Sequence, residues 1–289
     1  MSDDRTASPQ AADPPRTEQV VVDGLTFHVR IAGQGQPLVL LHGFPDDGDV
    51  WRHQVAPLAA LGRTVIVPDL RGCGATDAPV ATSRYRLDRL AQDVLDLVDQ
   101  LVPGGSAFDL AGHDWGAALG WHLAASHPHR VRRFAALSVG HPEAYRRAGA
   151  AQKRKGWYLL LFATPWLAEA VLRANGFRAL TRNAPTSEDA ERWRRNLGRP
   201  GRLSAGLAWY RANLTPTALA QHLPPVTVPT LGLYSDQDIA LAEDQMTGSA
   251  AYVEAPWRYV RLEGVGHWLQ IEAAAAINRE LIDWFGVMP

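Results

Sequence analysis

The sequence predicts an α/β protein in which a mostly parallel, doubly wound sheet carries a helical lid inserted after the sixth strand. Short apolar runs, typical of strands buried on both faces, alternate with longer segments of helical periodicity. That alternation predicts a parallel sheet covered by helices on both faces. It stops between residues 141 and 223, where tryptophans and a surplus of arginines occur in helical patterns, and it resumes afterwards.

The predicted elements follow one another along the chain. Residues 1–16 are rich in Ser, Asp, Pro and Ala without periodicity, so we expect a disordered tail. Strand-like runs at 20–22 and 26–30 flank Asp23-Gly24, a dipeptide typical of a hairpin turn. Further strands are predicted at 38–41, 64–67, 107–111, 131–138, 226–234 and 259–262, and helices at 87–101, 117–126 and 269–285. The predicted core is therefore 17–140 with 224–289, and the predicted lid is 141–223.

The composition excludes several classes of function. Lys+Arg 29 against Asp+Glu 30 gives a formal net charge of -1, so charge provides no general attraction for nucleic acid or anionic lipid. The polar N-terminus lacks the apolar core of a signal peptide, and the most apolar run, 157–167, is too short to span a bilayer. The single cysteine, Cys73, excludes an internal disulfide and a cysteine-based metal site. We expect a cytoplasmic protein with a small apolar substrate and no metal, cofactor, nucleic-acid partner or membrane insertion.

The sequence around Asp114 has the order strand, turn, helix. The turn reads Gly-His-Asp-Trp-Gly at residues 112–116 and resembles the nucleophile elbow of the α/β-hydrolase fold, with aspartate in the central position. Glycines on both sides let neighbouring backbone approach, and the helix N-terminus that follows favours negative charge. Asp114 could instead be only the N-cap of that helix. The apolar strand before it, the small-residue helix after it and the partners described next favour a nucleophile.

A nucleophilic carboxylate becomes an ester when it attacks a substrate, and a base must then activate water. Histidine suits this role because its pKa lies near neutrality. Of the ten histidines, His267 lies in a Gly-rich loop between a late strand and the last helix, where this fold carries its base. His42 and His113 lie near the predicted site, and we interpret them as supports of their loop and turn.

Two aspartates follow the predicted strand at 226–234, and either could hold the tautomer of His267. Asp238 is favoured because the usual strand-end turn of this fold places the acid about four residues beyond the last apolar strand position. Asp236 remains the alternative and would otherwise form the turn. Asp114, Asp238 and His267 then follow the order nucleophile, acid, base, as expected for this fold.

The segment Leu-His-Gly-Phe-Pro at 41–45 follows the third predicted strand. In this fold such a loop supplies one backbone N–H of an oxyanion hole, and the residue after the nucleophile supplies the other. We therefore assign the oxyanion hole to Phe44 and Trp115. A second Gly-rich loop, residues 69–77, lacks the Gly-Lys-Ser/Thr ending of a phosphate-binding loop, so we interpret it as a structural brace with Cys73 as an inert small residue.

Four motifs together resemble the α/β-hydrolase-fold epoxide hydrolases, and the resemblance covers residues 20–285. They are His-Gly-Phe-Pro at 42–45 with Trp-Arg at 51–52, Asp-Leu-Arg-Gly at 69–72, the elbow at 112–116, and Gly-His-Trp at 266–268. The resemblance implies an enzyme that opens an epoxide to a vicinal diol through an ester on the elbow aspartate. The chain departs from the commoner pattern at Ser235-Asp236, where Gly-Glu is more usual, and at Ala117, which replaces a frequent glycine.

Epoxide hydrolases of this family carry two lid tyrosines that hydrogen-bond the epoxide oxygen. Tyr210 lies in a Trp-Tyr-Arg segment similar to the family's, Tyr158 in a Trp-Tyr segment resembles the second, and Tyr145 is a spare candidate. A phenol can donate a hydrogen bond or a proton to the alkoxide that ring opening creates. Lid packing is the alternative role for each tyrosine. The residues expected to line an apolar substrate pocket are Trp157, Phe162, Trp209 and Trp268.

Haloalkane dehalogenases resemble this chain at the elbow and are the first alternative function. Their halide is held by N–H donors, typically the elbow tryptophan and a second tryptophan or an asparagine in the oxyanion loop, where this chain has Phe44. Lid tyrosines are unnecessary for halide release, so the sequence favours an epoxide hydrolase. A second alternative is a protein that only binds an apolar ligand under its lid. The complete set of nucleophile, acid and base argues against it.

Overall fold

The computed structural model describes residues 15–102 and 104–286. The predicted tail at 1–16 falls outside these residues except for its last two. Arg16 already pairs with Ile31 in the sheet, so the predicted tail extends too far at its C-terminal end.

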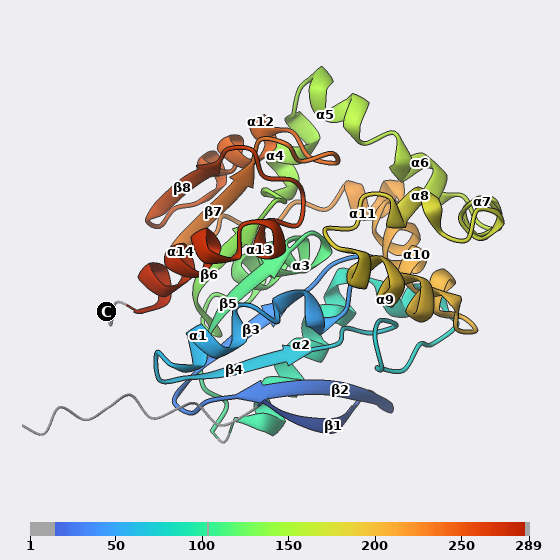
Figure 1. The fold of residues 1–289 in the computed structure, drawn as a ribbon. Coiled ribbons are helices and arrows are strands. Elements are labelled where there is room, and N and C mark those ends of the chain that lie inside the picture. Colours follow the sequence, from blue (N-terminus) through green and yellow to red (C-terminus); the bar gives the residue numbers. More distant parts are fainter. Residues whose placement is uncertain (1–14, 103, 287–289) are drawn as a thin grey trace, which may run out of the picture.

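The sheet has eight strands in the order β1-β2-β4-β3-β5-β6-β7-β8. Only the pairs β1–β2 and β2–β4 are antiparallel, and the other pairs are parallel. This confirms the predicted α/β class with a mostly parallel sheet (Figure 1). The strands are β1 (Arg16–Val22), β2 (Leu25–Ala32), β3 (Gln36–Leu41), β4 (Arg63–Pro68), β5 (Phe108–His113), β6 (Val131–Leu137), β7 (Thr230–Ser235) and β8 (Trp257–Leu262).

Local sequence explains several strand limits. The turn between β1 and β2 has positive φ at both Asp23 (51°) and Gly24 (70°), as a two-residue hairpin of the predicted kind requires. β7 is shorter than the predicted 226–234, because Pro229 has no N–H for the ladder. Val226 forms only an isolated bridge, to Val253.

Helices cover both faces of the sheet. On one face α2 packs against α3 and β1, and on the other α1 packs against β4 and α14. The predicted helix at 87–101 is confirmed as α2, whereas the predicted helix at 269–285 is two helices, because Ala273 leaves helical geometry at φ -126° and ψ 41°. The core helices are α1 (Val55–Ala59), α2 (Leu87–Leu101), α3 (Trp115–Ser126), α12 (Glu243–Thr247), α13 (Leu269–Glu272) and α14 (Ala274–Gly286), with 3-10 turns at Gly48–Trp51, Thr82–Tyr85 and Gly248–Tyr252.

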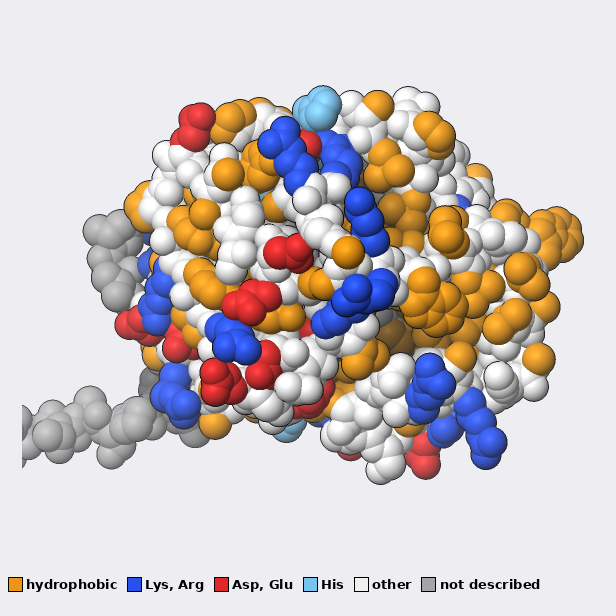
Figure 2. Space-filling view, turned by 90° about the horizontal axis from the view of Figure 1, so that it is seen from above, with side chains coloured by type: hydrophobic (Ala, Val, Ile, Leu, Met, Phe, Trp, Pro, Cys, Tyr) orange, Lys and Arg blue, Asp and Glu red, His pale blue; other side chains and the backbone are white. Residues whose placement is uncertain are grey.

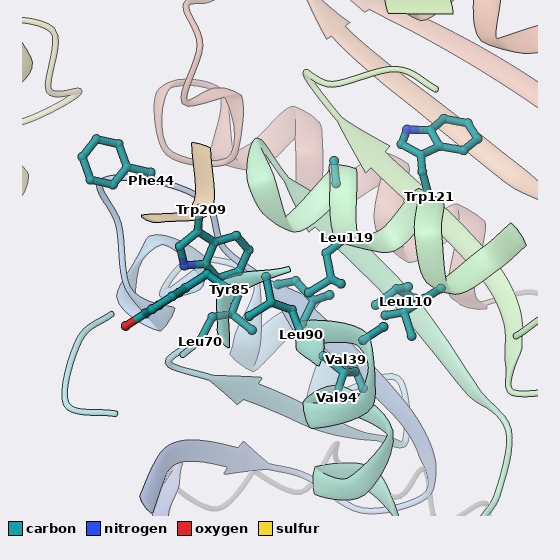
Figure 3. Packing of buried hydrophobic residues seen from close by; sticks show 14 of the residues in the cluster. Val39, Phe44, Leu70, Tyr85, Leu90, Val94, Leu110, Leu119, Trp121 and Trp209 are labelled. Carbon is teal, nitrogen blue, oxygen red and sulfur yellow. The ribbon is translucent and has the colours of Figure 1, made fainter. Parts of the chain in front are cut away.

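The small residues of α3 let this helix lie close to the sheet. A Cβ added at Gly120 would stand 2.3 Å from the ring of Phe134 in β6. Figure 3 shows part of the resulting core, in which side chains from α2 and α3 meet those of the central strands; the labelled members include Val39, Leu90, Val94, Leu110 and Leu119. Close packing therefore fixes the start of α3, and with it the elbow, against the strand ends.

Eight helices lie between β6 and β7, in the segment predicted as the lid (Figure 1). They are α4 (Pro142–Arg147), α5 (Ala150–Lys155), α6 (Tyr158–Ala163), α7 (Leu167–Ala174), α8 (Arg178–Thr181), α9 (Ser187–Gly198), α10 (Arg202–Asn213) and α11 (Pro216–Leu219). Arg52 of the core makes a two-pronged ion pair with Asp189 of α9, both N–O distances being 3.0 Å. Arg192 of the same helix donates to Asp49 at 2.8 Å. These pairs hold α9 against the core.

Across the part of the chain that the structure describes, every helix is too short or too polar to cross a bilayer.

Candidate active site

Asp114 occupies the turn between β5 and α3. Its φ of 54° and ψ of -122° lie outside the regions that non-glycine residues usually adopt, as at a strained elbow. The turn closes tightly, because a Cβ at Gly112 would stand 2.2 Å from the carbonyl oxygen of Gly116. A Cβ at Gly116 would in turn stand 2.2 Å from the carbonyl oxygen of Leu41. Glycine is therefore required on both sides of the carboxylate, as the motif predicts.

One carboxylate oxygen of Asp114 accepts a hydrogen bond from the backbone. The N–H of Phe44 donates to Oδ1 at 2.9 Å, and the backbone N–H of Trp115 lies near enough to lower the pKa of the carboxyl group. A Cβ at Gly43 would stand 2.2 Å from Oδ1, so the glycine of the oxyanion loop makes room for this contact. The N–H of Phe44 thus holds Oδ1, and Oδ2 is the oxygen that lies toward His267, 3.7 Å from its Nε2.

His267 lies between two carboxylates. Its Nε2 is 3.7 Å from Oδ2 of Asp114, and its Nδ1 is 2.8 Å from Oδ2 of Asp238. The other oxygen of Asp238 accepts the N–H groups of Ala240 at 2.8 Å and Leu241 at 2.9 Å, which fixes the carboxylate. All three side chains are buried. The structure brings together the three residues predicted as nucleophile, base and acid.

Asp236, the alternative acid, points elsewhere. Its Oδ1 accepts the backbone N–H of Gly264 at 2.8 Å, and its Oδ2 lies 3.6 Å from Arg261. These contacts brace the turn that leads into the loop of His267. The geometry therefore selects Asp238 as the partner of the imidazole.

His113 and His42 contact the backbone around the site. Nε2 of His113 hydrogen-bonds the carbonyl oxygen of His267 at 2.9 Å, and burial lowers the pKa of His113 to about 3, so this imidazole is neutral and donates. Nε2 of His42 accepts the N–H of Leu70 at 2.9 Å, while its Nδ1 lies 2.9 Å from the carbonyl oxygen of Gly43. Both histidines hold loops in place, in the positions expected of supports.

The charges around His267 decide its protonation. Burial alone lowers the pKa of this imidazole, but the negative charges of Asp238, Asp114 and Asp46 raise it to about 9. Burial also raises the pKa of Asp114, while the charge of His267 opposes that change. At neutral pH the imidazole is therefore protonated and lies between carboxylates.

Two lid helices bring aromatic residues above Asp114. Tyr158 from α6 and Tyr210 from α10 have ring centroids 6.5 Å apart, and Phe162 packs edge-on to Tyr210 at 5.0 Å. The indole of Trp115 meets Tyr210 edge-on at 5.0 Å. Burial, followed by the charge of Asp114, raises the pKa of both phenols well above the ordinary value. Both hydroxyls therefore remain protonated and can donate.

Tyr145, the spare candidate, also faces this region from α4. Its pKa is raised by burial and further by the charge of Asp114. Its hydroxyl accepts a hydrogen bond from Gln152 at 3.3 Å, so this phenol already has a partner in the lid.

The four residues predicted to line the pocket have different positions. Phe162 is buried beside the tyrosines and faces Phe44 at 5.8 Å, whereas the buried indole of Trp209 lies 6.0 Å from that of Trp115 and donates to the carbonyl oxygen of Arg71 at 3.2 Å. Trp157 is 63% exposed, so the prediction for it is wrong: the inward face of α6 begins one residue later. Trp268 packs edge-on to His267 at 4.8 Å and thus borders the base, away from the lid aromatics.

Asp46 is a buried carboxylate that the motifs do not indicate. It accepts indole N–H bonds from Trp193 of the lid and Trp268 of the base loop, both at 2.8 Å. Burial raises its pKa to about 7, and its charge contributes to the raised pKa of His267. An acidic residue directly after Phe-Pro of the oxyanion loop is the one sequence signal that could have marked it.

Comparisons with known proteins agree with this geometry. A family model of the alpha/beta hydrolase fold matches residues 36–274. Epoxide hydrolase 4 of Homo sapiens is 33% identical over 274 residues, which cover 89% of this chain and 74% of that protein. Epoxide hydrolase A of Mycobacterium tuberculosis is 31% identical over 318 residues, which cover 93% of this chain and 97% of that protein.

Solved structures show the same likeness. The crystal structure of Epoxide Hydrolase A from Mycobacterium thermoresistibile superposes with a TM-score of 0.81 at 27% identity, over 94% of this chain and 98% of that one. A mutant of an epoxide hydrolase from Bacillus megaterium superposes with a TM-score of 0.83 at 25% identity, over 93% of this chain and 100% of that one. The chain therefore belongs to the α/β-hydrolase-fold epoxide hydrolase family.

Proposed function

We propose that this protein is an epoxide hydrolase that opens an apolar epoxide to a vicinal diol through an ester on Asp114. The observation that supports this proposal is that two lid phenols, Tyr158 and Tyr210, lie 6.5 Å apart between ring centroids, with the ring of Tyr210 5.0 Å from that of Trp115, the residue after Asp114. A carboxylate nucleophile and two hydrogen-bond donors are the groups that ring opening needs.

In the first step Oδ2 of Asp114 attacks a ring carbon, and the bond from that carbon to the epoxide oxygen breaks. The electron pair goes to the oxygen, which takes a proton from Tyr158 or Tyr210. The products are a hydroxyalkyl ester and a tyrosinate. Because the ester carries no charge, His267 loses one of the carboxylates that raise its pKa. The proton of His267 then returns to the tyrosinate, which leaves a neutral imidazole.

In the second step the neutral imidazole of His267 removes a proton from water, and the resulting hydroxide attacks the ester carbonyl carbon. The N–H of Phe44 already hydrogen-bonds the carboxylate of Asp114, and that of Trp115 lies near it, where the negative charge of the tetrahedral intermediate develops. Collapse of the intermediate expels the alkoxide, which takes the proton of the hydroxyl group added from water and leaves as the diol. It also restores the carboxylate beside a protonated His267, so the proton count of the cycle closes.

The deciding experiment is a single turnover in heavy-oxygen water, followed by digestion of the enzyme. We expect the label in the peptide that carries Asp114, because water attacks the ester on the enzyme. Unlabelled peptide together with diol formation would exclude the ester. A bromoalkane assayed beside styrene oxide separates halide release from diol formation. Since the lid carries two phenols, Tyr158 and Tyr210, and the oxyanion loop has Phe44 where a halide-binding asparagine would stand, we expect the diol and no halide.

A further inference from the structure

The outer face of the lid carries apolar side chains that no described part of the chain covers. In α6, in α7 and at the residues that begin them, five large apolar residues are exposed, and we call them the outer lid patch: Trp157 63%, Leu160 78%, Trp166 85%, Leu167 52% and Val171 38%. The other large exposed apolar residues of the described chain are single ones on separate elements. Figure 2, seen from above, shows hydrophobic side chains gathered on the lid side, with Lys and Arg side chains near them. Such a contiguous patch marks an interaction surface.

Helix α6 has two apolar faces with different surroundings. Tyr158 and Phe162, four residues apart, point inward, where both rings contact Tyr210. Trp157 and Leu160, three residues apart, share the outward face and are exposed. The patch therefore lies across a single helix from the site.

Positive charge surrounds the outer lid patch. Residues 144–182 contain eight Arg or Lys and one acidic residue, Glu169, although the whole chain has a net charge of -1. Glu169 is paired with Arg211 at 2.7 Å, so it does not offset the other cations. Five of these cations are exposed and pair with no described residue: Lys153, Arg154, Arg173, Arg178 and Arg182.

The backbone at Trp166 is held in place, because its N–H donates to the carboxylate of Glu169 at 2.9 Å. The φ of Trp166, 69°, is one that a bulky side chain rarely adopts, and its indole is the most exposed of the patch. The chain thus keeps a disfavoured backbone conformation at a residue that gains no burial within the fold.

We propose that the outer lid patch docks on the surface of an anionic lipid layer. Indoles favour the depth where apolar chains meet headgroups, and nearby cations favour anionic headgroups. A second copy of this chain fits less well, since a symmetric contact would bring two positive rims together. An apolar epoxide dissolved in the lipid would then reach the outer face of α6, whose inner face carries Tyr158 and Phe162. This statement about the substrate rests on the proposed function, whereas the docking does not.

The test is sedimentation of the full chain with vesicles of phosphatidylcholine alone and of equal parts phosphatidylcholine and phosphatidylglycerol. We expect stronger association with the anionic vesicles. The double variant Leu160→Ser with Trp166→Ser should lower the partition coefficient about tenfold or more. The double variant Lys153→Glu with Arg154→Glu should abolish the preference for anionic vesicles. Matched controls outside the lid, Val80→Ser and Arg279→Glu, should bind as the wild type does.

Catalysis is measured separately. Diol formation from a water-soluble epoxide without vesicles should be the same in every variant, since none of these residues contacts the site. If the wild type forms no diol but binds vesicles through the patch, the proposed function fails and the docking stands. Equal vesicle binding by the wild type and the Leu160–Trp166 variant, or no binding by either, would overturn the docking. A wild-type dimer that this variant converts to a monomer would assign the patch to a second copy and overturn it too.

Discussion

The proposed cycle requires the charge of Asp114 to control the proton on His267. Nε2 of His267 is 3.7 Å from Oδ2 of Asp114, and the pKa of the imidazole is raised to about 9. Asp114→Asn keeps the shape of the side chain and removes its charge, as ester formation does. An opposite charge at such a distance changes a pKa by about 1 to 3 units. We therefore expect the pKa of His267 to fall by that amount in the variant. Burial still lowers this pKa, but the charge of Asp114 no longer raises it.

The measurement is an NMR titration of the histidine imidazoles, with the His267→Gln spectrum to assign the signal. Between the two pKa values the imidazole should be protonated in the wild type and neutral in Asp114→Asn. Intact mass must show that the asparagine is retained. Asp236→Asn is the matched control, since Asp236 lies in the same region but bonds to Gly264, and it should leave the titration unchanged. Equal pKa values in the wild type and Asp114→Asn would mean that the ester leaves the base protonated, and the proton-return step would then be wrong.

Three further variants test other parts of the site. His267→Gln should accumulate the ester, visible as a mass adduct after epoxide treatment, and an unmodified mass would contradict the assignment of the base. Tyr210→Phe should slow diol formation, and Tyr158→Phe added to it should lower the rate by about 10²–10⁴ in single turnovers; an unchanged rate would return both phenols to a packing role. Gln152→Leu should lower the free energy of unfolding by about 1–3 kcal/mol, because the buried N–H of Ala242 loses its acceptor. Thermal unfolding measures that loss, and the exposed neighbour Lys153→Leu is the control that should show none.

The strands of the core were predictable because their burial is uniform. β3 is buried at five of its six positions, and its apolar run Leu-Val-Leu-Leu is typical of a strand covered on both faces. The predicted limits were wrong where the backbone of a single residue starts or ends a strand or a helix. Pro229 delays β7, and Ala273 divides the last helix without any glycine or proline to announce the break.

The sequence also indicated some residues of the candidate site and misplaced or missed others. Asp114 and His267 lie in short motifs that follow strands, so the sequence indicated them, whereas it left Asp236 open beside Asp238 as the acid. Trp157 was misplaced because apolar residues surround α6, and periodicity then does not tell the inner face from the outer. Asp46 was missed because its partners Trp193 and Trp268 stand 147 and 222 residues away in the chain. Contacts of that range leave no local signal.

The contacts of α5 connect the lid to the loop that carries Asp238, the predicted acid. Gln152 donates to the carbonyl oxygen of Ala240 at 3.1 Å and accepts the N–H of Ala242 at 2.8 Å, and Lys155 donates to the carbonyl oxygen of Asp238. The same short loop supplies the N–H groups that hold the carboxylate of Asp238. Because the lid also carries both phenols, a lid displaced from the core would remove the proton donors and loosen the acid at the same time. The nucleophile and the base would remain on the core, without the groups that complete either chemical step.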